Sequence, residues 1–200
     1  MFRTVKTFFL YIVLISLCLI SASCASSKTA ENALPVHKIK VTITKRYTLL
    51  QPEYLLENLS SLQLIDVSYK GHKFSAQVFV QADISGVYLT LLNSFGTSIG
   101  ELEYTPQTIS FKSAFFPVHI NPAYIIADFQ FCYYDAAAVA EQLEKSNLHF
   151  TIETRDKGTT EIRRIYMYKR CIEEIIRKNH YVQIINHYRN YSYTLQEAAE

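Results

Sequence analysis

The sequence predicts a mainly β fold interrupted by one strongly apolar helical segment. Apolar and polar residues alternate in short runs through residues 38–113 and again through 148–195, as they do in strands with one face in a core. Between these regions, residues 122–134 are apolar nearly all round, which indicates a helix that is covered on most sides. Aromatic residues make up 14% of the chain, with 15 Tyr, 12 Phe and no Trp, and such residues favour strands and fill apolar interiors.

The amino-terminal stretch predicts an export signal. Arg3 and Lys6 precede the apolar run 8–20, and the small residues 21–23 lead directly to Cys24. A run of this length is too short to span a bilayer, and its order of charged head, apolar run and small residues is that of a signal peptide. Small residues before a cysteine resemble the lipobox of bacterial lipoproteins, although Ser stands at position 21 where Leu is usual. Ordinary cleavage after residue 23 is the alternative.

A lipidated Cys24 would determine where the protein resides. One acyl chain contributes ~0.8 kcal/mol per buried CH₂ and anchors a protein only marginally, whereas the several chains, such as palmitate, of a lipoprotein cysteine anchor it firmly. Ala25 and Ser26 follow the cysteine, with no Asp, and by resemblance to enteric sorting signals this favours the periplasmic face of the outer membrane. We expect residues 1–23 to be removed and the small, polar residues 24–37 to form a lipidated tether.

Charge and cysteine content restrict the partners. The chain has 20 basic and 18 acidic residues, and removal of Arg3 and Lys6 with the signal leaves 18 of each. A neutral domain gives no indication of a nucleic-acid partner or of an anionic membrane face. Besides Cys24, the mature chain keeps Cys132 and Cys171, either as a disulfide or as separate buried thiols.

The first half of the domain reads as a meander of strands. Ile39, Val41 and Ile43 alternate with polar residues, and Pro52 precedes a short helix at 53–59. Alternation slips once within 61–69, which predicts a β-bulge there. The further strands expected in this half are 74–83, 87–92, 99–104 and 108–112.

The second half begins with helices. Asn121 is a predicted N-cap with Pro122 in the first helical position, and Asp135 is a predicted cap for a second helix at 136–143. The remaining strands are expected at 148–154, 160–168, 171–177, 181–188 and 191–195.

The segment 126–134 (IADFQFCYY) and the Ala-rich helix after it resemble the central signature of an uncharacterised family of bacterial lipoproteins. The strand pair 87–102 and the tail 184–195 resemble the same family, whereas Tyr134 stands where Trp is usual and Asp135 where Pro is usual. That family is often encoded among genes for aryl-polyene pigments, and its fold is similar to that of the lipoprotein acceptor LolB. The resemblance implies that residues 38–200 form an incomplete antiparallel β-barrel (LolA/LolB-like) with a helical lid over an apolar cavity.

The expected cavity would be lined by apolar side chains of two strands and the helix. They are Val78, Val80, Leu89, Leu91, Ile126, Phe129, Phe131 and Tyr133. Burying an acyl or polyene chain there would contribute ~25 cal/mol per Å² without charged contacts. The residues alone favour a packed core, and the resemblance favours a cavity. Asp128 and Gln130 either bond neighbouring backbone, contact a ligand's polar head, or serve catalysis.

The sequence contains few features that indicate a catalytic site. There is no phosphate loop or dinucleotide fingerprint, and the six His are scattered. Glu173 and Glu174 read as a solvated strand face. We therefore expect no enzyme, cofactor or metal site, but a lipoprotein that binds a lipid or lipid-linked hydrophobic molecule, such as an aryl-polyene lipid or lipoprotein acyl chains, for transport or membrane insertion. The alternative is a ligand-free scaffold that interacts with envelope transport or biosynthesis proteins.

Overall fold

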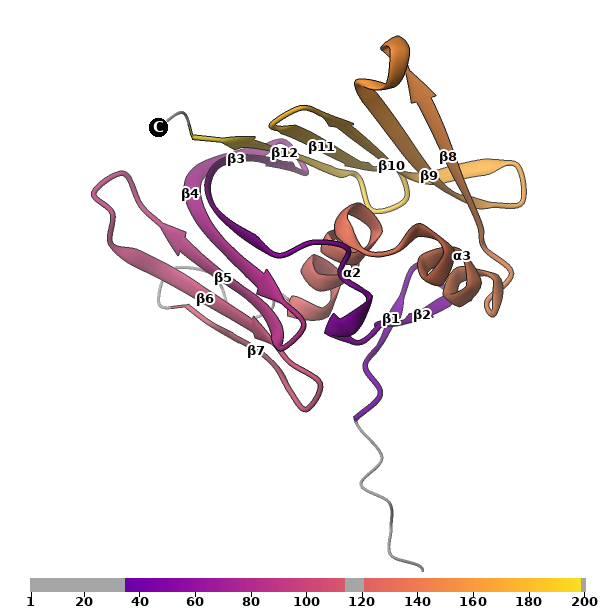
Figure 1. Cartoon of the computed structure of the whole chain (residues 1–200), viewed down its shortest axis with the longest axis horizontal. Helices are drawn as coiled ribbons and strands as arrows, with labels where there is room; N and C mark the ends of the chain where they lie inside the picture. Colours follow the sequence, from indigo (N-terminus) through magenta and orange to yellow (C-terminus); the bar gives the residue numbers. More distant parts are fainter. Residues whose placement is uncertain (1–34, 114–120, 199–200) are drawn as a thin grey trace, which may run out of the picture. The chain divides into compact units, whose positions relative to one another are not determined.

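The computed structural model describes residues 35–113 and 121–198 (Figure 1). The predicted signal peptide, Cys24 and most of the predicted tether lie outside this range. Within it, no helix combines the length and the apolar character needed to cross a membrane.

Ten strands form a single antiparallel sheet. Its strands are β3 (Leu59–Tyr69), β4 (His72–Asp83), β5 (Gly86–Leu92), β6 (Ser98–Tyr104), β7 (Ile109–Lys112), β8 (His149–Arg155), β9 (Thr160–Met167), β10 (Arg170–Lys178), β11 (Tyr181–Asn186) and β12 (Tyr191–Glu197). The order across the ten strands is β7-β6-β5-β4-β3-β12-β11-β10-β9-β8. Because β7 and β8 are the two edges, the sheet stays open. The predicted mainly β, antiparallel architecture is confirmed, with strand ends close to those expected.

The β-bulge predicted within residues 61–69 is absent from β3, and the structure has a register shift in β10 instead. β3 pairs with both neighbours without a register shift, whereas β10 shifts register between Cys171 and Glu173. The slip in the β3 pattern has a different cause. Gln63 faces the inner side of the sheet and is buried, while Leu64 faces outward and is 46% exposed. A polar residue inside and an apolar one outside imitate the pattern of an inserted residue.

The two helices begin where their caps predict. Asn121 accepts a hydrogen bond from the Ala123 amide (3.0 Å) and α2 runs from Pro122 to Tyr133. The Asp135 carboxylate accepts from the Ala138 amide (2.8 Å) at the start of α3 (Ala136–Glu144). The sheet curves around α2, while a small hairpin of β1 (Lys38–Lys40) and β2 (Arg46–Thr48) and the helix α3 lie beside it (Figure 1). An apolar helix covered in this way buries nearly its whole surface.

The segments before β3 are less regular than the sequence suggested. The first strand ends at Lys40, so that Val41 is still buried but Ile43 is 84% exposed in a turn. The short helix is a single 3₁₀ turn, η1 (Pro52–Tyr54), and a second such turn, η2 (Asp156–Gly158), joins β8 to β9. Three or four residues cannot establish an independent helix or strand, so tertiary contacts decide their conformation.

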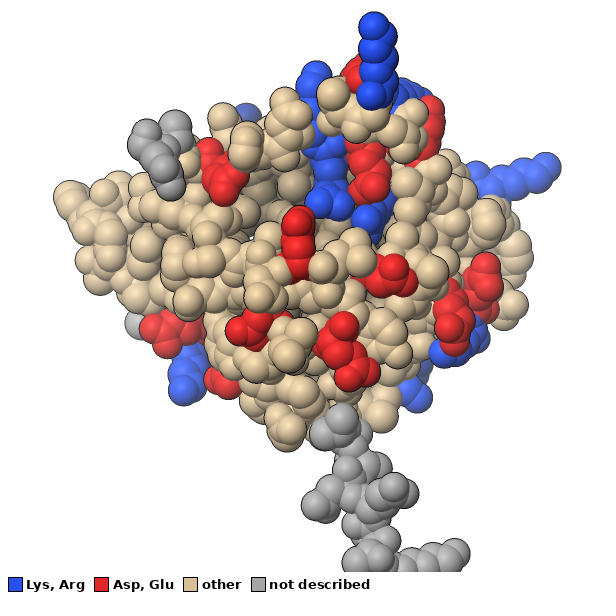
Figure 2. Space-filling view, in the orientation of Figure 1, with Lys and Arg blue, Asp and Glu red and all other residues tan. Residues whose placement is uncertain are grey.

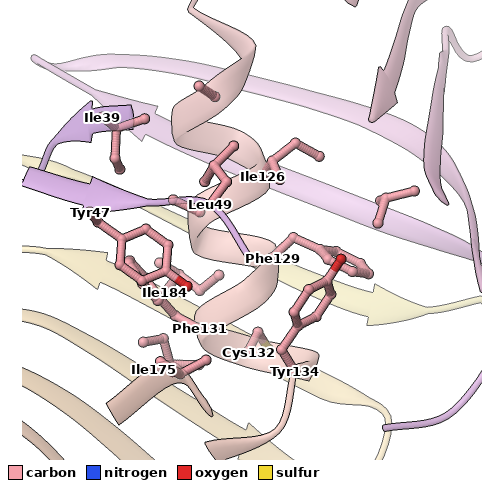
Figure 3. Close-up of a cluster of buried hydrophobic side chains, with 14 of the residues drawn as sticks. Ile39, Tyr47, Leu49, Ile126, Phe129, Phe131, Cys132, Tyr134, Ile175 and Ile184 are labelled. Atoms are coloured by element: carbon pink, nitrogen blue, oxygen red, sulfur yellow. The ribbon is translucent and has the colours of Figure 1, made fainter. Parts of the chain in front are cut away.

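The core is the cluster around α2 (Figure 3). Tyr47 of β2 packs edge-on against Phe131 of α2, with ring centroids 4.8 Å apart. Ile175 and Ile184 approach the helix from β10 and β11. The core therefore joins three layers: the hairpin, the helix and the inner face of the sheet.

Candidate functional site

The inner face of β3, β4 and β5 presents apolar side chains to α2. Cross-strand pairing places Val78 opposite Leu91 and Val80 opposite Leu89, all on one face. Val78 and Val80 are each 4% exposed and Leu89 is 8% exposed, whereas Leu91 is only partly buried. This face thus grades from a packed centre to a region that water still reaches.

The predicted cavity residues of α2 do not all face the same way. Ile126, Phe129 and Phe131 are 0%, 7% and 1% exposed, and Tyr133 is partly exposed. Phe131 points to Tyr47 of the hairpin, whereas Phe129 points to the other side of the helix, toward Tyr134 (Figure 3). The structure therefore divides the predicted lining between two sides of α2.

Gln130 joins the helix to the backbone that follows the hairpin. Its Oε1 accepts from the Leu50 amide (2.9 Å) and from the Tyr47 hydroxyl (3.1 Å), and its Nε2 donates to the Leu50 carbonyl (2.7 Å). The Tyr104 hydroxyl donates to the same carbonyl (2.7 Å), and burial raises the pKa of Tyr104 to about 12. Because Gln130 is fully buried and bonds backbone, this contact positions the chain.

Asp128 lies in the most unusual polar group of the protein. Its Oδ2 accepts from the hydroxyls of Tyr191 (2.7 Å) and Tyr193 (3.2 Å), which extend from β12. A second carboxyl group, Glu173 of β10, approaches from the sheet and accepts from Asn186 Nδ2 (2.7 Å). Asp128 and Glu173 are 5% and 2% exposed. The prediction that Glu173 is a solvated residue is wrong, because the bulge in β10 turns it inward.

Burial makes this pair of carboxyl groups hard to ionise. It raises the pKa of Asp128 to about 7, and burial together with the adjacent Asp128 raises the pKa of Glu173 well above its usual range. The guanidinium of Arg189 acts in the opposite direction on both. Two acids in a dry site cannot both carry a charge, so they titrate as a pair that retains a proton near neutral pH. Glu173 Oε1 has no hydrogen-bond partner within the described residues.

Charged residues also hold the carboxyl end of α2. Arg163 of β9 donates through Nη1 to the carbonyls of Phe131 (3.1 Å) and Tyr134 (3.2 Å), which end the helix. Its Nε pairs with Glu161 (2.8 Å), which also pairs with Arg177 of β10 (3.1 Å). A cation at this end donates hydrogen bonds to the free carbonyls and interacts favourably with the negative end of the helix dipole. Figure 2 shows acidic and basic side chains close together in a hollow over this part of the sheet.

The two cysteines in the described part of the chain have raised pKa values. Cys132 and Cys171 are both free thiols, and burial raises the pKa of Cys132 to about 12. A thiol with a raised pKa is a poor nucleophile at neutral pH. Among residues 35–113 and 121–198, no three His, Cys, Asp or Glu side chains are arranged to hold a metal ion.

Sequence reasoning selected Asp128 and Gln130 but missed their partners. Tyr191 and Tyr193 are distant in sequence from Asp128, and nothing in their local pattern indicates that they face a helix carboxylate. The available signal was indirect: a carboxylate in an all-apolar helix requires hydrogen-bond donors from elsewhere in the fold.

A family model described as "Protein of unknown function (DUF3261)" matches residues 60–199. The matched range includes nearly all of the ten-stranded sheet and both α-helices, and thus both Asp128 and Glu173. No curated protein matches the chain.

Proposed function

The chain belongs to the DUF3261 family, and we propose that it is a lipoprotein, anchored to the periplasmic face of the outer membrane, that binds a lipid or lipid-linked hydrophobic molecule for transport or insertion. The observation that carries the proposal is a strip of apolar side chains that face inward without being buried. Ile65 and Val67 of β3 and Leu91 of β5 point to the same side as the packed Val78, yet each is only partly buried.

Inward-facing apolar side chains that remain partly exposed are energetically unfavourable. Apolar side chains on the concave side of a sheet normally pack against a covering element, because each Å² kept from water contributes ~25 cal/mol. The side chains of this strip are only partly covered, so their further burial is still favourable. An acyl or polyene chain that covered them would provide this burial without any charged contact. The strip defined by Ile65, Val67 and Leu91 is therefore our proposed cargo surface.

A polar head of the ligand would meet the carboxyl pair. Gln130 has its amide oxygen and nitrogen engaged by Tyr47 and Leu50, so Asp128 is the better candidate of the two predicted head contacts. Tyr193, which bonds Asp128, stands opposite Val67 in the sheet, next to the cargo surface. Glu173 lies beside the same group, and its pKa is raised by burial and by Asp128.

The anchor and the finer fold assignment are part of the proposal. Cys24 would carry the acyl chains, and the open sheet around α2 would correspond to a LolA/LolB-like half-barrel with α2 as its helical lid. An aryl-polyene lipid or lipoprotein acyl chains are the cargo that the family resemblance favours. Cys24→Ala should move the protein from the membrane fraction to the soluble periplasm, and a variant that stays membrane-bound would contradict lipidation.

Lipid extraction tests the cargo. The protein is purified from membranes, washed, and extracted with organic solvent for mass spectrometry, and we expect a bound lipid or pigment in stoichiometric amount. Val67→Glu places a charge on the cargo surface and should abolish loading. Leu64→Glu adds the same charge to the outer face of the same strand, where the side chain is 46% exposed, and should leave loading unchanged. Equal loading of the two folded variants would refute the cargo surface.

A second candidate function has its own support. Val78, Val80 and Leu89 are almost fully buried, as are the predicted lining residues of α2 other than Tyr133, which suits a filled core. A ligand-free scaffold lipoprotein in an envelope complex would fit such a core. That function predicts an empty extract from correctly folded, membrane-purified protein.

A further inference from the structure

Three turns, one from the β1–β2 hairpin and two from one end of the ten-stranded sheet, bring six basic residues together. The Ile43 amide, in the turn between β1 and β2, donates to the Tyr188 hydroxyl in the turn between β11 and β12 (3.0 Å). Arg189 of the latter turn donates to the Lys40 carbonyl. The guanidinium of Arg170, beside the turn between β9 and β10, lies 5.9 Å from the centroid of the Tyr188 ring. These contacts make one continuous surface.

We call this surface the basic patch. Its cationic members are Lys40, Lys45, Arg46, Lys169, Arg170 and Arg189. Lys40, Arg46, Lys169 and Arg170 are exposed, and Lys45 is partly exposed. Across the described part of the chain, neither the lysines of the patch nor Arg46 and Arg170 form an ion pair, whereas Arg155 and Arg164 on the outer face pair with Glu153. Unneutralised cations on one surface attract an anionic partner.

Two large apolar side chains project from the same surface. Ile43 is 84% exposed and Tyr168 is 82% exposed. The turn that carries Ile43 is held by reciprocal bonds, in which the Lys45 amide donates to Thr42 Oγ1 (3.1 Å) and the Thr42 amide donates to the Lys45 carbonyl (3.2 Å). Tyr168 sits at the tip of its hairpin with φ of 57°. Defined turns thus hold both apolar side chains outward, beside the cations.

We propose that the basic patch docks the domain on a membrane surface that contains anionic phospholipid. Cations near an anionic bilayer each contribute about 1 kcal/mol, and an apolar or aromatic side chain beside them enters the interface. A nucleic acid or an acidic protein would use the cations but would leave Ile43 exposed. The patch also includes β1, which begins 14 residues after Cys24, a length that reaches roughly 50 Å at most when fully extended. An acylated Cys24 would therefore hold the patch close enough to the membrane to dock.

This inference does not depend on a cargo. It shares with the proposed function only the membrane location, and vesicle binding is measured without any extracted lipid. A domain that binds no cargo can still dock, and a cargo carrier can lack docking, so failure of one proposal is distinguishable from failure of the other.

Vesicle co-sedimentation tests docking. The Cys24→Ala protein released to the periplasm, which lacks residues 1–23 and the acylation site, is mixed with vesicles of phosphatidylcholine alone or of phosphatidylcholine with phosphatidylglycerol. We expect binding only to the anionic vesicles, falling steeply at high salt because screening shortens the range of the attraction. Equal binding to both vesicle types, or no binding to either, would overturn the proposal.

Matched charge reversals locate the effect. Lys45→Glu with Lys169→Glu should weaken binding to anionic vesicles by about tenfold or more. Lys157→Glu with Lys178→Glu changes the net charge equally, but these exposed residues lie at or beside the turns at the opposite end of their strands, and we expect less than a twofold effect. Equal losses would assign binding to net charge and refute the patch.

A third pair separates a membrane from an acidic macromolecule. Ile43→Ser with Tyr168→Ser should weaken binding to anionic vesicles several-fold, while thermal unfolding, which reports fold integrity, stays unchanged. Unaltered vesicle binding would show that the cations alone account for docking and would overturn the inference that Ile43 and Tyr168 enter the bilayer interface.

Discussion

The two halves of the inner face hold α2 by different kinds of interaction. On the β3–β5 side the helix meets apolar residues such as Val78 and Leu89. On the β9–β12 side apolar residues such as Ile175 are joined by polar contacts from Arg163 and Tyr191. Apolar contacts are non-directional, so a helix and a hydrocarbon chain can replace one another there. Hydrogen bonds are directional and costly to break when buried. The directional contacts of the polar half therefore fix the position of α2.

The largest expected effect comes from Arg163. Arg163→Ala would leave Glu161 with a weaker partner and the last carbonyls of α2 unsatisfied, and loss of one member of a buried charged network costs about 3–5 kcal/mol. Urea unfolding of the variant measures this loss. Arg155→Ala removes an exposed cation that pairs with Glu153, and we expect less than about 1 kcal/mol. Similar losses would show that the polar half is not specially important.

The next effect is a dependence of stability on pH. The pKa of Asp128 is raised to about 7 from an ordinary value of 3.8, so between these values the unfolded chain releases a proton that the folded protein keeps. The free energy of unfolding is therefore greatest at the acidic end of this window and falls by about 4 kcal/mol as the pH rises through it. Thermal or urea unfolding between pH 4 and 8 measures the slope.

Single substitutions test the origin of that slope. Glu173→Gln removes an acid whose own pKa is raised in the folded protein, and should reduce the slope above pH 4, while burial of Asp128 maintains the rest. Glu174→Gln alters the neighbouring residue on the outer face, which pairs with Arg164, and should keep the slope. A flat profile in the parent protein would contradict the assignment of a shared proton.

A smaller loss is expected at Gln130. Gln130→Ala would break the bonds to Leu50 and Tyr47 and leave buried backbone groups without partners, which costs about 2 kcal/mol. Gln142→Ala on α3 removes only an exposed contact with Lys145 and should change the free energy of unfolding by less than about 0.5 kcal/mol. If Gln130→Ala were as mild as its control, the helix would not depend on this contact.

The smallest effects should separate the packed centre from the cargo surface. Val80→Ala removes buried methyl groups and should cost about 2 kcal/mol, whereas Val67→Ala, in a partly exposed position, should cost less than about 1 kcal/mol. Equal costs in the lipid-free protein would mean that Val67 already packs as core.

Local signals in the sequence predicted the elements with local causes. Asn121 and Asp135 cap their helices because a short polar side chain bonds amides two or three residues away. The strand from residue 74 alternates because its two faces have different environments. Gln63 was placed wrongly by the alternating pattern, because its inward orientation depends on the register with β4 and not on its neighbours in sequence.

The sequence alone determined where the chain forms strands and helices and which helix is apolar enough to be covered. The tertiary structure decided which polar groups meet. The bulge at the start of β10 turns Glu173 toward Asp128 across 45 residues of chain, and three turns distant in sequence bring Lys40, Arg170 and Arg189 to one surface. The composition indicates only that the domain is neutral, because a net charge does not show where the charged residues lie. Only folding separates the cations on the surface from the carboxyl groups in the interior, where burial keeps a proton on the pair.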